Sequence, residues 1–149
     1  VVPHGMIQPS PDTRIDGWDA CSGYYYEDST INGFSHTHVS GTGCCDYGDV
    51  LLMPTVGEQR YQTTDPQSQQ LAYSSAFSHE NETAEPGYYS VFLDTYQVKA
   101  EISATKRGAI HRYTFPESSE AGFILDLDYS LQRQTNSDMG IEVIRNLWT

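Results

Sequence analysis

Apolar and polar residues alternate with a period of two through much of the second half of the chain. From Tyr96 to Ala104, every second residue is apolar or aromatic, and the residues between them are polar. The pattern returns from Ala109 to Phe115, where it also takes in His111 and Tyr113. Because successive side chains of a strand point to opposite faces, both segments are predicted to be strands with one buried face.

Two further strands are predicted toward the end of the chain. In the first, one side holds Phe123, Leu125, Leu127 and Tyr129, which we expect to be buried, and the other holds Ile124, Asp126 and Asp128. The second opens at Ile141, Val143 and Arg145. No helical stripe extends beyond two turns. The pattern therefore predicts an all-β fold, an antiparallel β-sandwich formed by residues 1–149 as one domain.

The first 68 residues or so differ in composition and pattern from the rest of the chain. Glycine, proline, aspartate, serine and threonine are dense there, and periodicity is scarce. Short apolar pieces at 5–7 and 50–53 predict short strands between long connections. Long ordered loops commonly carry function, so this half is the first place to look for a binding site.

Charge and cysteine content narrow the classes of partner. The net charge is −12, and eight Lys and Arg residues do not form the basic patch that nucleic acid or anionic membranes require. The longest apolar run is only Val50 to Met53, so no membrane span is expected. A neutral ligand such as a sugar fits this charge.

Three cysteines, Cys21, Cys44 and Cys45, are expected to be buried thiols. The alternative is a disulfide bridge from Cys21 to one of the other two.

Trp18 and Asp19 are the first candidate binding residues. They stand side by side in a segment flanked by Gly17 and Gly23. An indole packs on the apolar face of a pyranose, and a carboxylate accepts hydrogen bonds from its hydroxyls. The alternative is a core tryptophan beside a turn-forming aspartate.

His36 and His38 are the second pair of candidates. They share a face if the segment is extended, so a zinc site with Cys44 or Asp46 as third ligand is one interpretation. The other interpretations are that these histidines donate hydrogen bonds to a ligand or a neighbouring domain, or that their role is purely structural.

We expect Asp46 and Asp49 to be turn residues rather than catalytic carboxylates. The acidic stretch from Phe77 to Glu85 is expected to be a solvated connection before the turn at Pro86-Gly87.

Several longer motifs, in this order and covering most of the chain, resemble the N-terminal domain of family 92 glycoside hydrolases. They are Pro3-His4-Gly5-Met6, Ser10-Pro11-Asp12-Thr13, Gly17-Trp18-Asp19, Cys21-Ser22-Gly23-Tyr24, Gly33-Phe34-Ser35-His36-Thr37-His38, Ser40-Gly41-Thr42-Gly43, Asp46-Tyr47-Gly48-Asp49, Met53-Pro54, Phe77-Ser78-His79-Glu80, Pro86-Gly87-Tyr88-Tyr89-Ser90-Val91 and Arg107.

The resemblance implies an exported bacterial α-mannosidase that acts on mannose-rich glycans, inverts anomeric configuration and requires calcium. It also implies two parts, an N-terminal β-sandwich and a helical catalytic domain, with the active site where they meet. This chain resembles only the first part. We therefore expect a fragment that is inactive alone, with no catalytic residue and no assigned metal ligand. The alternative is a free-standing carbohydrate-binding module, and a third interpretation is a small metal-dependent enzyme.

Overall fold

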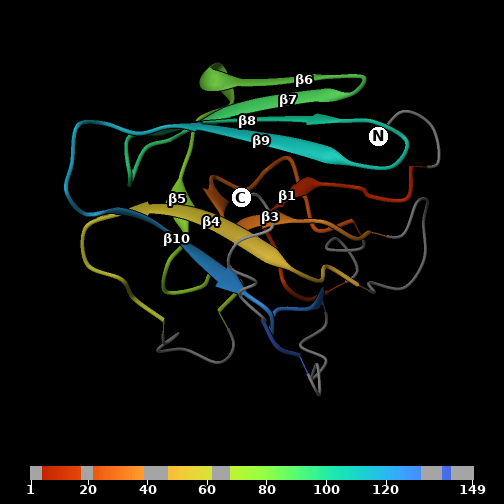
Figure 1. Ribbon diagram of the computed structural model, residues 1–149, viewed down its shortest axis with the longest axis horizontal. Helices are drawn as coiled ribbons and strands as arrows, with labels where there is room; N and C mark the ends of the chain where they lie inside the picture. Colours follow the sequence, from red (N-terminus) through yellow and green to blue (C-terminus); the bar gives the residue numbers. More distant parts are fainter. Residues whose placement is uncertain (1–4, 18–21, 39–46, 62–67, 132–138, 142–149) are drawn as a thin grey trace, which may run out of the picture.

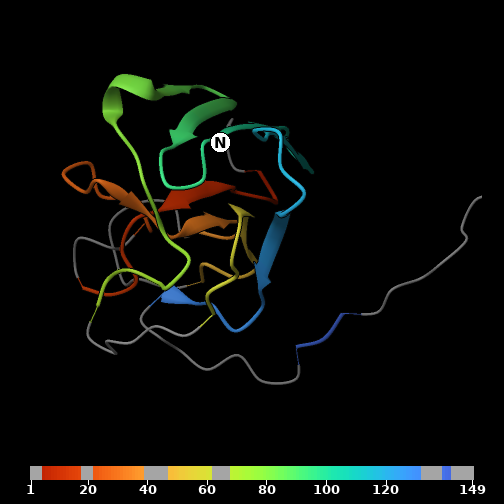
Figure 2. The same cartoon turned by 90° about the vertical axis from the view of Figure 1, so that its left-hand side faces the viewer.

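The computed structural model describes residues 5–17, 22–38, 47–61, 68–131 and 139–141, and these form two layers of antiparallel sheet (Figure 1). The layers stay separate when the molecule is turned by 90° (Figure 2). The described residues contain no α-helix and include the 3-10 turn η2 (His79–Asn81). The predicted all-β sandwich is confirmed.

The first sheet has four strands in the order β1-β3-β4-β10. Three of them come from the loop-rich half of the chain, and β10 returns from the other end to pair along the whole length of β4. The strands are β1 (Ser10–Asp12), β3 (Gly33–Ser35), β4 (Leu51–Val56) and β10 (Ala121–Asp126).

The second sheet is a meander in which each strand pairs with the next along the chain. Its segments are rich in the aromatic and β-branched residues that favour strands. The turn predicted at Pro86-Gly87 closes one hairpin, with Glu85 opposite Tyr88, and a second hairpin places Ala104 opposite Ala109. The strands are β6 (Glu82–Glu85), β7 (Tyr88–Leu93), β8 (Val98–Ala104) and β9 (Ala109–Thr114).

The core lies between the two sheets. Phe34 of β3 is fully buried, and its ring lies 6.4 Å from that of Tyr89 in β7 and 6.2 Å from that of Tyr113 in β9. A short pair, β2 (Thr30–Ile31) with β5 (Ser75–Ala76), adds Ile31 to this core. Contacts from one sheet to the other therefore hold the loop-rich half against the regular meander.

The predicted alternation of buried and exposed residues in β8 and β9 is confirmed, except at Glu101. Val98, Ala100 and Ile102 are buried as predicted, whereas Ile110 on the outer face of β9 is 71% exposed. Glu101 should face solvent, yet only 7% of it is exposed. Arg112 covers it, donating from Nε and Nη2 at 2.8 and 2.7 Å, and the hydrogen bonds from Arg112 and Tyr88 lower the pKa of Glu101 to about 2.

The predicted orientation of β10 is wrong. Ile124 is 6% exposed and belongs to the core, while Phe123 and Leu125 are 53% and 42% exposed. Ile124 pairs with Met53 of β4, which is also buried. Because β10 ends at Asp126, Tyr129 is no longer in phase with the strand and is buried independently of it.

Other predictions have mixed outcomes. Residues 5–7 are not in a strand, although Met6 N–H donates to the Lys106 carbonyl at 2.9 Å. The last predicted strand lies almost wholly in 142–149, and all three cysteines also lie outside the described residues. No helix in the described part of the chain is long and apolar enough to cross a bilayer.

Candidate functional site

Trp18 and Asp19 lie outside the described residues, but the chain on both sides of them is held firmly. The N–H groups of Thr13 and Arg14 both donate to the carbonyl of Gly23, at 2.7 and 3.1 Å. Backbone hydrogen bonds therefore join the described residues on the two sides of the predicted loop that carries Trp18 and Asp19.

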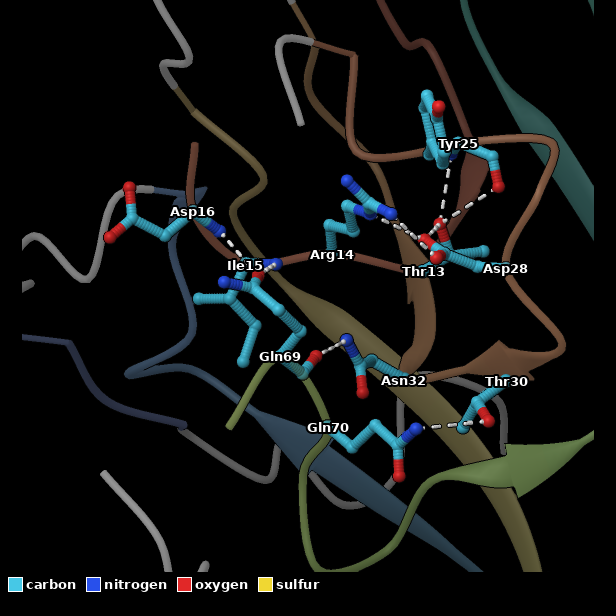
Figure 3. A network of polar contacts seen from close by, with 10 residues as sticks. All are labelled: Thr13, Arg14, Ile15, Asp16, Tyr25, Asp28, Thr30, Asn32, Gln69 and Gln70. Atoms are coloured by element: carbon cyan, nitrogen blue, oxygen red, sulfur yellow. Dashed lines mark hydrogen bonds and ion pairs between the residues drawn. The ribbon is translucent and has the colours of Figure 1, made fainter. Parts of the chain in front are cut away.

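A polar network ties the incoming side of this loop to the rest of the domain (Figure 3). Gln69 Oε1 accepts hydrogen bonds from the N–H groups of Ile15 and Asp16, at 2.9 and 3.0 Å. The Gln69 carbonyl in turn accepts from the side-chain amide of Asn32, which is fully buried. A distant segment of the chain thus fixes the backbone just before Gly17.

Arg14 braces the outgoing side of the same loop. Its Nε and Nη2 donate to the two carboxylate oxygens of Asp28 at 2.8 and 3.0 Å, and its guanidinium lies 3.9 Å above the Tyr25 ring. Thr13 Oγ1 donates to Asp28 and accepts from the Tyr25 N–H (Figure 3). A planar, two-pronged contact of this kind restricts orientation more than a single charge pair does.

Asp12 and His38 form a buried pair beside the loop base. His38 Nε2 lies 2.8 Å from Asp12 Oδ1 and 2.9 Å from Ser35 Oγ, and its Nδ1 donates to the Gln8 carbonyl at 2.7 Å. Burial opposes a charge on His38, but the hydrogen bond and charge of Asp12 outweigh it and raise the pKa of His38. Burial and the same carboxylate raise the pKa of Tyr129.

Gly23 brings the loop base and the buried pair into contact. A Cβ added to Gly23 would lie 2.0 Å from Asp12 Oδ1 and 3.1 Å from His38 Nε2. Sequence reasoning had not singled out Asp12. Its only signal was a place in the motif Ser10-Pro11-Asp12-Thr13.

His38 is also the last described residue before a second predicted loop, whose residues 39–46 lie outside the described part of the chain. At the base of this loop, His38 bridges to Tyr47, and Thr37 Oγ1 both donates to Asp49 Oδ2 and accepts from the Asp49 N–H. The described residues that flank the two predicted loops therefore meet at the buried Asp12–His38 pair.

His36 and His38 do not share a face. The ring of His36 stacks on His111 of β9 at 5.0 Å, and its Nδ1 donates to the Val50 carbonyl at 2.6 Å. Val50 has a φ of 59°, which is strained for a β-branched residue. Neighbouring residues therefore hold each histidine ring in a separate position.

The zinc interpretation is not supported. Both ring nitrogens of His38 are engaged inside the domain, so the ring has no lone pair for a metal. Asp46 and Cys44 lie outside the described residues. Among the described residues, no group of three or more His, Cys, Asp or Glu side chains is placed to hold a metal ion.

His111 is expected to make the fold sensitive to mild acid. Burial, with a contribution from nearby His36, lowers the pKa of His111 to about 4, whereas an unfolded histidine titrates near 6.5. The folded state therefore binds the proton less readily, and stability is lost as pH falls from about 6.5 toward 4. We expect the melting temperature to decline over this interval, and a His111→Phe variant to decline less.

Two other histidines with shifted pKa values act at higher pH. The pKa values of His38 and His79 are raised, so their contribution is complete below about pH 6.5 and is lost as pH rises through their folded values. A His79→Gln control should therefore change the pH profile above 6.5. Parallel profiles for the parent chain and His111→Phe between pH 6.5 and 5 would contradict the assignment.

The stretch from Phe77 to Glu85 is only in part the solvated connection expected from the sequence. Its second part is strand β6, and the Glu82 side chain is only 9% exposed. The Glu82 carboxylate accepts hydrogen bonds from Tyr24, His79 and Tyr89. These residues line a cleft of about 460 Å³, the Glu82 cleft, together with Ser10, Pro11, Tyr26 and Ala84.

Comparison with known proteins agrees with the fold and with the motifs. The model of the glycosyl hydrolase family 92 N-terminal domain matches residues 1–147. A family GH92 α-mannosidase from Bacteroides thetaiotaomicron, solved with mannoimidazole, is 43% identical, with a TM-score of 0.81 over 88% of this chain and 17% of that protein.

Two further relatives are more distant. A family GH92 inverting mannosidase from the same species is 33% identical, with a TM-score of 0.70 over 87% of this chain and 16% of its own. A protein of Arthroderma benhamiae described as an uncharacterized secreted glycosidase is 29% identical over 79% of this chain and 15% of its own length. The chain thus spans about a sixth of each relative. It belongs to glycosyl hydrolase family 92, as the N-terminal domain of that family.

Proposed function

We propose that this chain is the N-terminal part of an exported, calcium-dependent, inverting exo-α-mannosidase that acts on mannose-rich glycans. Its two long loops complete the sugar pocket, and a helical catalytic domain of the same parent chain packs against them. The observation that carries the proposal is the meeting of both loop bases at Asp12 and His38. Identity of 43% to an α-mannosidase solved with mannoimidazole supports the choice of sugar.

Trp18 and Asp19 are the proposed sugar contacts. Trp18 stacks on a pyranose face, and Asp19 accepts hydrogen bonds from hydroxyl groups. The network around Gln69 and Arg14 supports this assignment, because a contact loop must hold its geometry without the ligand to keep the entropy cost of binding low.

His36 and His38 have different parts in this proposal. His38 bonds through both ring nitrogens inside the domain, so it acts on the sugar through the loops that it holds. His36 commits only Nδ1 to the Val50 carbonyl, and its Nε2 is the nitrogen we assign to a sugar hydroxyl or to the catalytic domain. Contact of His36 with the substrate or with the catalytic domain stays a prediction.

The catalytic carboxylates and the calcium ligands are assigned to the parent protein outside this chain. Inverting hydrolysis uses a carboxylic acid and a carboxylate about 6.5–9.5 Å apart, on either side of the scissile bond. The carboxylates described above are bound to partners within the sandwich, Asp12 to His38 and Asp28 to Arg14. In the described part of the chain, no three or more His, Cys, Asp or Glu side chains come together as a group that could hold a metal ion.

Trp18→Ala in the complete protein that contains this chain tests the proposal. If Trp18 stacks on the sugar, the loss is about 1–3 kcal/mol by analogy with stacking on other aromatic platforms. The rate of mannose release should then fall roughly ten- to a hundredfold, with little change in melting temperature.

A structural tryptophan would behave in the opposite way. Truncation of a core tryptophan costs about 3–5 kcal/mol of stability. A large drop in melting temperature with unchanged activity per folded molecule would contradict the assignment of Trp18. Glycan binding by a complete protein that hydrolyses no mannoside would instead favour the free-standing binding module.

A further inference from the structure

The Glu82 cleft lies between the β6–β7 hairpin and the segment that follows β1. Its lining combines aromatic rings from Tyr24, Tyr26 and Tyr89 with the carboxylate of Glu82. Its volume of about 460 Å³ lies in the range typical of small-molecule sites. None of the interactions described for Trp18 or for the two long loops accounts for this cleft.

The floor of the cleft is a compact array of hydrogen-bonding groups. Glu82 Oε2 accepts from Tyr24 OH at 3.0 Å and from His79 Nδ1 at 2.6 Å, and Oε1 accepts from Tyr89 OH at 2.6 Å. Burial, then Glu82, raises the pKa of both tyrosines, which therefore stay neutral. Each hydroxyl oxygen keeps acceptor capacity after donating to Glu82, and the carboxylate can accept further bonds.

Tyr26 adds an exposed aromatic ring to the lining of the cleft. The Tyr26 ring stacks on His79, with centroids 4.3 Å apart and planes 15° apart, and Phe77 packs edge-on against His79 at 5.0 Å. Tyr26 is nevertheless 63% exposed. A ring that stacks on a neighbouring ring and stays largely exposed to solvent suits the apolar face of a pyranose.

The charge of the cleft favours a neutral ligand over an anionic one. Among the described residues that line it there is no lysine or arginine, and the carboxylate of Glu82 repels phosphate, sulfate and uronate groups. Neighbouring hydroxyl groups of a neutral sugar both donate and accept, which matches an array of one carboxylate and two phenols.

We propose that the Glu82 cleft binds one pyranose unit of a neutral glycan, with Tyr26 as the stacking platform and Glu82, Tyr24 and Tyr89 bonding its hydroxyls. The identification of that unit as mannose rests on the proposed function. The binding of a neutral pyranose in the cleft is inferred from the geometry of the cleft alone.

NMR titration of the 149-residue chain tests this assignment. The probes are α-linked mannobiose, cellobiose and lactose. We expect mannobiose to shift the signals of Tyr26 and His79, and Tyr26→Ala to weaken that binding roughly tenfold. Tyr26→Phe keeps the ring and should keep the affinity. Tyr61→Ala is the matched control, because Tyr61 is 67% exposed and lines a different pocket.

The outcomes separate this inference from the proposed function. Binding of mannobiose that Tyr26→Ala leaves unchanged, in a variant with the parent melting temperature, overturns the cleft assignment and leaves the mannosidase proposal intact. Binding of only cellobiose or lactose at Tyr26 supports the cleft and contradicts mannose as its ligand. Absence of any sugar-induced shift at Tyr26 and His79 overturns the inference.

Discussion

Replacing Gly23 with alanine should destabilise the chain more than any other single methyl addition in its described part. The new Cβ would lie 2.0 Å from Asp12 Oδ1, and the backbone φ of +79° adds strain. A left-handed conformation costs a non-glycine residue about 1–2 kcal/mol, and disrupting a buried ion pair costs about 3–5 kcal/mol. The melting temperature should fall by on the order of 10–20 °C.

Gly17→Ala is the matched control for this variant. Gly17 has a φ of +97°, so the backbone strain is similar, but no described atom lies within 4 Å of the added Cβ. Thermal melts of both variants should therefore show a loss of about 1–2 kcal/mol for Gly17→Ala and a much larger loss for Gly23→Ala. Equal losses would mean that Gly23 does not press against the Asp12–His38 pair.

Ile124→Ala should lower the free energy of unfolding by about 2–5 kcal/mol, whereas Leu125→Ala should lower it by about 1 kcal/mol or less. The two residues are neighbours in β10, but Ile124 is 6% exposed and Leu125 is 42% exposed. Truncation therefore leaves a cavity at the first position and only trims a surface at the second.

Urea unfolding with matched m-values measures the difference. The comparison is decisive because the alternation of Phe123, Leu125, Leu127 and Tyr129 predicts the larger stability loss for Leu125→Ala. A larger loss for Leu125→Ala would restore the sequence-based orientation of β10 and contradict the pairing of Ile124 with Met53.

Strand patterning predicted β8 and β9 well because both have one buried and one solvent-facing side. The same reasoning failed for β10, where both sides of the strand are apolar at 123–125 and period alone cannot choose between them. Pairing with β4 made that choice, by placing Ile124 beside the buried Met53.

Some residues of the candidate site could likewise be identified from the sequence, and others could not. Trp18, Asp19, His36 and His38 were identified from side-chain chemistry and local motifs, because those features are carried by a few consecutive residues. Asp12 and Glu82 were missed, since neither has a local pattern that separates it from the many other acidic residues of the chain. Each is defined by partners that are distant in sequence, such as His38 for Asp12 and Tyr24 for Glu82.

By itself, the sequence determined the all-β class, most of the meander and its turns, and the family. These follow from period-two alternation, from turn residues with restricted backbone preferences, and from motifs read in order along the chain. Only the tertiary structure decided which face of β10 is buried, that His36 and His38 point to different neighbours, and that Glu82 is enclosed. Those features depend on contacts between residues far apart in the chain, which burial and pairing select and local pattern does not encode.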